Sequence, residues 1–204
     1  MRGKVAFVGC VALVLLVAGA LVVGADDKAA AKKMTPEQQA MMEAWMKAAT
    51  PGENHKLLEP MVGTFNAKVT MWGMPGQPPD VSSGTSENSW VLGGRFVQQV
   101  FDGQEMGQPF HGIGYTGYDN YKKKYTGTWM DSMGTMTLLM TGTADADGKV
   151  FKFEGTMDDV VSGKASTIRT VTRVIDRNQH VFEMYGPDPS GKESKVLEIV
   201  YTRK

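Results

Sequence analysis

The chain from Phe65 to Arg203 consists of short runs in which apolar and polar residues alternate, separated by clusters of Gly, Asp, Asn and Pro. In residues 65–71 every second residue is apolar and the residues between them are Asn, Lys and Thr, which is the period of a half-buried strand. Similar segments predict nine more strands. They lie near residues 82–91, 95–102, 109–118, 124–131, 135–144, 149–157, 165–176, 179–186 and 192–203.

The links between these segments are short, so neighbouring strands are predicted to be antiparallel. Gly93-Gly94 has the composition of a two-residue hairpin loop. Residues 72–82 contain three prolines and are predicted to form a loop over the end of the sheet. About ten antiparallel strands close into a barrel that can hold a ligand. We therefore expect residues 51–204 to form a closed antiparallel β-barrel.

A helix is predicted before the barrel, over residues 35–50. Thr35 is a favoured N-cap residue, Pro36 takes the first helical position and Gln38 completes a capping box. Pro51-Gly52 is predicted to end the helix.

One side of this amphipathic helix is apolar. Its stripe consists of Met41, Met42, Trp45 and either Ala48 or Ala49. Two partners are compatible with this stripe: the barrel itself, or a protein or membrane surface.

The first 25 residues have the pattern of a secretory signal peptide. Arg2 and Lys4 precede an uncharged apolar run over residues 5–23, and small residues follow, which predicts cleavage before Asp26. An exported protein, periplasmic or secreted, is expected. The alternative is an uncleaved anchor, because residues 5–23 are long enough to cross a bilayer. Residues 26–34 are small, polar and charged and are predicted to form a disordered linker.

Composition narrows the possible chemistry. Cys10 is the only cysteine and lies within the predicted signal peptide, so the processed chain has neither a disulfide nor a thiolate. Cleavage also removes Arg2 and Lys4, which leaves 20 basic and 22 acidic residues. This balance does not favour binding to nucleic acid.

Four motifs in order are similar to a family of bacterial proteins. They are LLEPMVGTF at residues 57–65, GYDNYKKKY at 117–125, WMDSMGT at 129–135, and HVFEMY at 180–185 followed by EIVYTRK at 198–204. Over about residues 51–204 the chain resembles the domain-of-unknown-function family 1579. The resemblance implies a lipocalin- or calycin-like barrel, often exported, with no established reaction. Gly63-Thr64-Phe65 also resembles the Gly-x-Trp start of lipocalin-type barrels, with Phe65 in place of Trp.

Aromatic side chains are the predicted walls of a cavity, with methionines among them. Which of them face inward depends on strand register, because a slip of one residue inverts the set. The alternative is that they fill a dry core. The aromatic candidates for ligand binding are Trp90, Phe96, Tyr115, Tyr125, Trp129 and Phe182.

Charged residues in the last strands are candidate polar anchors. If Arg177-Asn178 forms a two-residue turn, Arg173 and His180 project from the same face as Phe182. With Glu198 they would form an anchor for a carboxylate or another polar ligand head, since buried charges need partners. The alternative is a ladder of charges on the outside of the barrel.

The histidines and glycines leave further alternatives. His55 is expected to be exposed, whereas His111 or His180 could point into the barrel and bind haem iron. No metal-binding spacing occurs, so no metal or cofactor is predicted. Gly112 and Gly114 mark either a bend in a strand or space left for a ligand.

No nucleophile motif or phosphate-binding loop is present, and no catalytic residue is predicted. An enzyme with an acid or base such as Asp131 is the third possibility. The sequence favours a binding module for a small apolar or amphipathic molecule, without stable membrane insertion after cleavage. The alternative is a structural or interaction protein with a filled core, in which the helix binds a partner.

Overall fold

The computed structural model describes residues 34–73, 76–105, 107–158, 163–188 and 191–204. The chain divides into two units, residues 1–40 and residues 41–204. The predicted signal peptide lies outside the described residues, as does the predicted linker except for its last residue. None of the helices that the structure describes is long and apolar enough to cross a membrane.

The predicted helix is confirmed as α2 (Pro36–Ala49). Its capping box is formed, since the Gln38 backbone N–H donates to Thr35 Oγ1 at 3.3 Å and the Thr35 N–H donates to Gln38 Oε1 at 2.9 Å. Met41 and Trp45 of the predicted apolar stripe are 45% and 49% exposed. No residue of α2 is buried, so this stripe is not part of a core.

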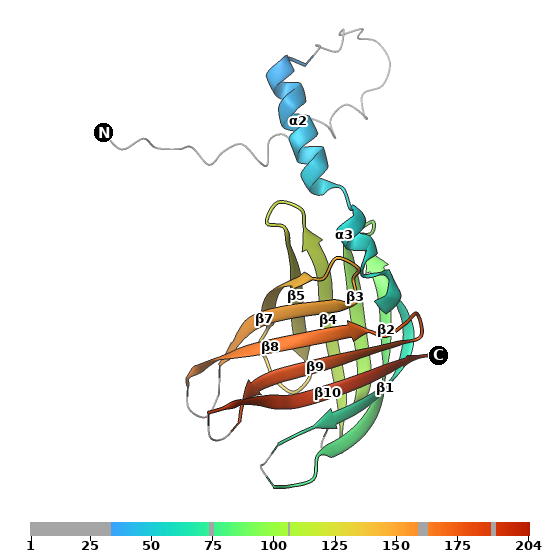
Figure 1. The fold of residues 1–204 in the computed structure, drawn as a ribbon, viewed down its shortest axis with the longest axis vertical. Helices are drawn as coiled ribbons and strands as arrows, with labels where there is room; N and C mark the ends of the chain where they lie inside the picture. Colours follow the sequence, from blue (N-terminus) through green and yellow to red (C-terminus); the bar gives the residue numbers. More distant parts are fainter. Residues whose placement is uncertain (1–33, 74–75, 106, 159–162, 189–190) are drawn as a thin grey trace, which may run out of the picture. The chain divides into compact units, whose positions relative to one another are not determined.

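Two short helical segments, α3 (Glu53–Lys56) and η2 (Glu59–Met61), lead from α2 to the sheet. Ten strands then follow in an antiparallel closed barrel, as predicted, in which each strand pairs with its neighbours in sequence and β1 pairs with β10. In Figure 1 the strands β7 to β10 cross in front of β3 to β5. The strands are β1 (Gly63–Met71), β2 (Asp80–Val91), β3 (Phe96–Glu105), β4 (Gln108–Asp119), β5 (Lys124–Asp131), β6 (Leu138–Ala144), β7 (Val150–Asp158), β8 (Ala165–Val174), β9 (Gln179–Pro187) and β10 (Glu193–Arg203).

Strand alternation places one set of side chains inside the barrel. Ala67 of β1 lies opposite Tyr201 of β10, and both are buried. Phe65 and Phe101 pack with them in one core cluster, while Leu58, Tyr125 and Phe151 belong to a second. Because directly opposed residues share a face, the register assigns the paired strand residues to the inside or the outside, with an irregularity in β10 between Lys195 and Leu197.

Two predicted links differ from the structure. Gly93-Gly94 is the centre of a four-residue link, because β2 ends at Val91 and β3 begins at Phe96. The segment predicted as a loop over residues 72–82 is shorter, since Asp80 to Ser82 already pair with β1. The three prolines all precede Asp80, which agrees with their exclusion from a regular ladder.

Candidate functional site

The interior of the barrel contains a cavity of about 790 Å³, and all ten strands contribute to its lining. This volume falls within the range of about 300–1,000 Å³ that is typical of small-molecule sites. Most of the lining is apolar. Large apolar side chains on its wall include Val69, Phe110, Trp129, Phe153, Phe182 and Ile199.

Trp129 is positioned in this wall by two glycines of β4. A Cβ atom at Gly112 would lie 2.2 Å from Cζ2 of Trp129, and one at Gly114 would lie 2.9 Å from Cε3. The Trp129 Nε1–H donates to Asp131 Oδ2 at 3.0 Å. The two glycines therefore make space for the Trp129 indole, which itself lines the cavity.

One end of the cavity is closed by the segment that precedes β1. Leu58 is fully buried and packs in a cluster with Tyr125 and Phe151. The Tyr125 hydroxyl donates to the Asn54 carbonyl at 2.8 Å. Burial, followed by the nearby Tyr118, raises the pKa of Tyr125 to about 12. These contacts make the α3 and η2 segment the floor of the cavity.

Arg203 fastens this floor to the last strand. Its Nη1 donates to the Val62 carbonyl at 2.9 Å and its Nη2 to the Pro60 carbonyl at 3.1 Å. The guanidinium carbon lies 4.6 Å from the centre of the Phe65 ring. Gly63 has a φ of +134°, and a Cβ there would lie 2.0 Å from Arg203 Nη1. Only glycine therefore admits Arg203 at this corner.

A row of polar side chains lies in the wall just above the floor. Gln99 Nε2 donates to Ser86 Oγ at 2.8 Å and to the Tyr201 hydroxyl oxygen at 3.1 Å. Ser86 in turn donates to Asn88 Oδ1 at 2.8 Å, and Asn88 Nδ2 donates to the Met61 carbonyl at 2.8 Å. Burial raises the pKa of Tyr201 to about 12. The row is uncharged at neutral pH.

His180 lines the cavity beside this row and is 96% buried, with an exposure of 4%. Its ring stacks on Tyr201 with a centroid separation of 4.5 Å and meets the Phe65 ring edge-on at 4.7 Å. Its Nδ1 is buried and makes no hydrogen bond with any described residue. Burial, and secondly the charge of Arg203, lower the pKa of His180 to about 4, so the imidazole is neutral at pH 7.

Carboxylates lie toward the opposite end of the cavity. Glu105, Asp131 and Asp158 contribute to its lining. Burial raises the pKa of Glu105, and the charges of Asp131 and Asp80 raise it further. None of the described residues that line the cavity is Lys or Arg. The cavity therefore has a neutral polar end and an acidic end.

The predicted anchor of Arg173, His180 and Glu198 is not formed. A two-residue turn would have paired Arg173 with Phe182, but residues 175–178 connect the two strands and Arg173 pairs with Val181. This shift of one residue puts Arg173 on the outer face and leaves His180 inside. Glu198 also lies outside, opposite Glu183.

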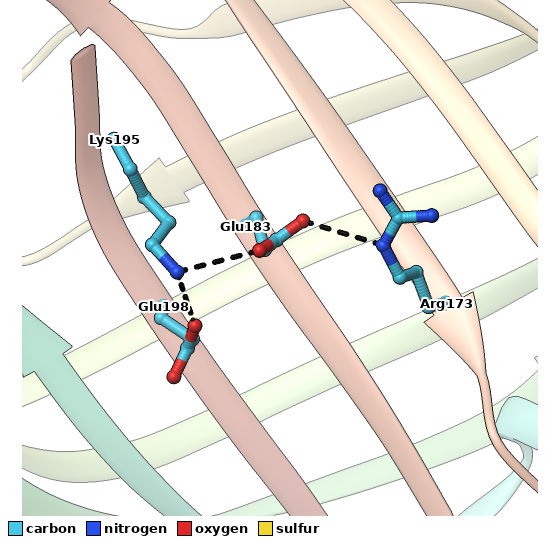
Figure 2. Close-up of polar contacts among 4 residues, drawn as sticks. All are labelled: Arg173, Glu183, Lys195 and Glu198. Atoms are coloured by element: carbon cyan, nitrogen blue, oxygen red, sulfur yellow. Dashed lines mark hydrogen bonds and ion pairs between the residues drawn. The ribbon is translucent and has the colours of Figure 1, made fainter.

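The outer face instead carries a charged cluster across β8, β9 and β10, shown in Figure 2. Glu183 Oε2 lies 3.5 Å from Arg173 Nε, and Glu183 Oε1 lies 3.4 Å from Lys195 Nζ. Lys195 also pairs with Glu198. Hydrogen bonding to Glu198 is the main cause that raises the pKa of Lys195. This is the exterior charge ladder that the sequence left open as the alternative.

The aromatic candidates are divided between several places. Trp129 and Phe182 line the cavity, whereas Tyr125 of β5 packs against the floor and bonds the Asn54 carbonyl. Tyr115 borders the cavity by its position on β4, but its hydroxyl accepts a hydrogen bond from Gln98 at 2.9 Å on the outer face. Trp90 donates to Glu59 at 2.7 Å. Phe96 lies over Gly117 and borders a smaller hollow of about 260 Å³ near Ala48.

The histidines are also divided. His111 lies on the outer face, with Nδ1 2.7 Å from Asp102 Oδ1. The expectation that His55 is exposed is wrong, because it is 5% exposed and its ring meets Tyr118. Its Nδ1 accepts a hydrogen bond from the Gly52 N–H at 3.1 Å. Burial, followed by the charge of Arg95, lowers the pKa of His55.

Sequence reasoning missed the polar row of Gln99, Tyr201, Ser86 and Asn88. A signal was present in the pair Gln98-Gln99 within the strand at 95–102, because one of two adjacent glutamines on a barrel strand must face inward. The strand register was needed to decide which of them does so.

A family model matches the sequence, and a solved structure has a similar fold. The sequence model of a family described as "Protein of unknown function (DUF1579)" matches residues 50–203. A solved structure, the crystal structure of Rv2717c from M. tuberculosis, is similar with a TM-score of 0.57 and 15% identity. The alignment covers 76% of this chain and 99% of that chain, and at this identity the likeness concerns the fold alone. No curated protein matches the sequence.

Proposed function

Because the chain belongs to DUF1579, a family of proteins of unknown function, membership assigns it no activity, and we propose from the barrel interior that it binds a small molecule. The ligand is apolar or amphipathic. The barrel serves as a binding module, and the proposal includes no reaction.

The observation that carries this proposal is the cavity of about 790 Å³ inside the closed barrel. Protein interiors are close-packed, and voids much larger than a water molecule are few. This cavity is partly open to solvent, and its wall forgoes contacts that a filled core would have made. Its wall combines large apolar side chains with a few polar groups, which is the usual composition of a ligand site.

Two experiments test the proposal. Native mass spectrometry of protein purified from the cells that produce it should detect a bound small molecule.

In addition, the neutral dye Nile red should bind with enhanced fluorescence. Thr172→Phe, which fills the cavity from β8, should weaken dye binding by about tenfold or more. Arg173→Phe adds the same side chain to the outer face one residue later and should leave dye binding unchanged. Equal binding to both variants would contradict the proposal.

A second function, docking of a partner protein through α2, is favoured by one observation. Met41, Trp45 and Met46 of α2 are about half exposed, at 45%, 49% and 57%. Deletion of residues 35–50 should then leave the melting temperature of the barrel unchanged and abolish a complex isolated by cross-linking. A large fall in melting temperature would instead show that α2 stabilises the barrel.

We also propose that the protein is exported after cleavage between Ala25 and Asp26. The charged start, the apolar run and the small residues at 23–25 support this proposal. Intact-mass measurement of the protein from its own cells should give a chain that begins at Asp26. A full-length mass in the membrane fraction would instead indicate an anchor formed by residues 5–23.

A further inference from the structure

We infer that the ligand of the cavity carries an uncharged hydrogen-bonding group, such as a hydroxyl, carbonyl or amide, which binds at Gln99 and Tyr201, and that carboxylate ligands are rejected. This inference rests on the proposed binding function and names the class of ligand. It follows from the direction of the hydrogen bonds in the polar row and from the distribution of charge around the cavity.

At Gln99 and Tyr201 the hydrogen bonds of the row leave one acceptor and one donor unused. Both N–H groups of Gln99 are engaged, with Ser86 Oγ and with the Tyr201 oxygen. The hydrogen bonds that these two side chains make with described residues use neither Gln99 Oε1 as an acceptor nor the Tyr201 hydroxyl as a donor. An amide oxygen and a phenolic O–H at one site match a group that both donates and accepts, which is the pattern of an alcohol.

The position of this pair fits a ligand head rather than a structural bond alone. Gln99 and Tyr201 both line the cavity, and Tyr201 is 95% buried, with an exposure of 5%. His180, stacked on Tyr201, has a further unpaired nitrogen at the same end. The buried Nδ1 of His180 lowers stability unless a partner satisfies it. A ligand group at this end would provide that partner.

An anionic head would find no ion-pair partner among the described residues of the cavity wall. The lining residues that the structure describes include no Lys or Arg, and His180 is neutral at pH 7. Arg203 of β10, whose charge acts on His180, does not line the cavity, because its guanidinium lies over Phe65 and is bonded to the backbone carbonyls of the floor. A carboxylate would lose its hydration without gaining an ion pair. The carboxylates Glu105, Asp131 and Asp158 at the other end would repel it further.

The apolar part of the ligand has room along the strands. From Ala67, opposite Tyr201, to Met71 at the end of β1 the chain advances four residues, which is about 13 Å in a strand. Val69 and Met71 line the cavity over this distance. A chain of about the length of decanol would place its hydroxyl at Gln99 and Tyr201 and its alkyl chain among these residues.

The test compares four probes of equal chain length: decanol, decyl chloride, decylamine and decanoate. Each displaces Nile red from the wild-type protein at pH 7.5, and dissociation constants are derived from the displacement. We expect decanol to bind about tenfold more tightly than decyl chloride and decanoate, as one net hydrogen bond allows. Decanoate binding as tightly as decanol would overturn the inference. Decylamine as the tightest probe would overturn it in favour of the acidic end.

A matched pair of variants locates the head group. Tyr201→Phe removes the inner hydroxyl and should weaken decanol binding by about tenfold while changing decyl chloride binding by less than about twofold. Tyr115→Phe removes a hydroxyl that bonds Gln98 on the outer face and should change neither. If Tyr201→Phe does not fold, Gln99→Met serves the same purpose. Unchanged decanol binding in the inner variant would overturn the assignment.

The outcomes also separate this inference from the proposed function. If neither Nile red nor any of the four probes binds, the proposed function itself fails. If the dye and the probes bind but decanoate or decylamine is preferred, the cavity is a binding site and only the assignment of the head group is wrong.

Discussion

The two faces of the strands β8 to β10 differ in charge, although their residues alternate along the same chain. The inner face carries Thr170, Thr172, His180 and Tyr201, which are neutral at pH 7, and its one charged residue among the described residues of these strands, Arg203 at the end of β10, is bonded to backbone carbonyls. The outer face carries two acidic and two basic side chains within one cluster. Neighbouring residues of one strand therefore differ in charge according to the face on which they lie, because an unpaired charge inside the barrel costs far more free energy than one in water.

The largest effect is expected from emptying the inner face. Phe65→Ala removes a fully buried ring that contacts His180, Tyr201 and Arg203. We expect the free energy of unfolding to fall by about 3–5 kcal/mol, as for other buried Phe to Ala changes. Denaturant unfolding followed by circular dichroism measures this change. A loss below about 1 kcal/mol would show that the inner face is not the core.

Acid should distinguish the two faces next. The pKa of His180 is lowered from 6.5 to about 4 in the folded protein, so between these values the unfolded chain binds a proton that the folded chain does not. With respect to His180, the free energy of unfolding is therefore at its full value above about pH 6.5 and decreases as the pH falls toward 4. The shift corresponds to about 3 kcal/mol.

Denaturant unfolding at several pH values between 7 and 4 measures this loss. His180→Phe keeps a ring on Tyr201 and should reduce the dependence on pH. His111→Gln changes a histidine on the outer face and serves as the control. A pH dependence that is the same in His180→Phe and in the wild type would contradict the assignment of the titrating group.

A smaller effect is expected from crowding the wall. Gly112→Ala places a methyl group against the Trp129 indole and should cost about 1–3 kcal/mol, with a shift of tryptophan fluorescence and weaker dye binding. Gly117→Ala, on the outer face of the same strand, pushes against Phe96 instead. Its effect on dye binding should be negligible, and equal effects of the two substitutions on dye binding would contradict this distinction.

The smallest effect concerns the outer cluster. The side chain of Arg173 is 50% exposed and that of Glu183 is 14% exposed, so their coupling in a double-mutant cycle of Arg173→Met and Glu183→Gln should be about 1 kcal/mol, at the upper end for surface pairs. The coupling should decrease with added salt. A coupling above about 2 kcal/mol, unaffected by salt, would mean that the cluster behaves as a buried pair.

The number of strands was predictable from the sequence, because Gly, Asp and Pro clusters separate runs of alternating polarity. The capping box at Thr35 and Gln38 fixed the start of α2 in the same local way. Such features depend on residues within one turn or one strand, and their physical causes are visible in a short window of sequence.

The register between β8 and β9 was not predictable from the sequence. The set of side chains that line the cavity was therefore not predictable either. Asp176 Oδ1 accepts hydrogen bonds from the backbone of Asn178 at 2.7 Å and of Gln179 at 2.9 Å, which extends the link beyond two residues. That single step moved Arg173 outside. The burial of His55 likewise depends on contacts with Tyr118, far along the chain, and no local pattern encodes such contacts.

The hydrogen bond from Arg203 to Val62 joins residues that are 141 positions apart, and this separation bears on the order of folding. Until β10 is in place, β1 and β9 each have an unpaired edge that can join another chain. Contacts between such distant residues form slowly. The enclosed space comes into existence only when the last strand is inserted, so occupancy of the barrel by a ligand would report that folding is complete.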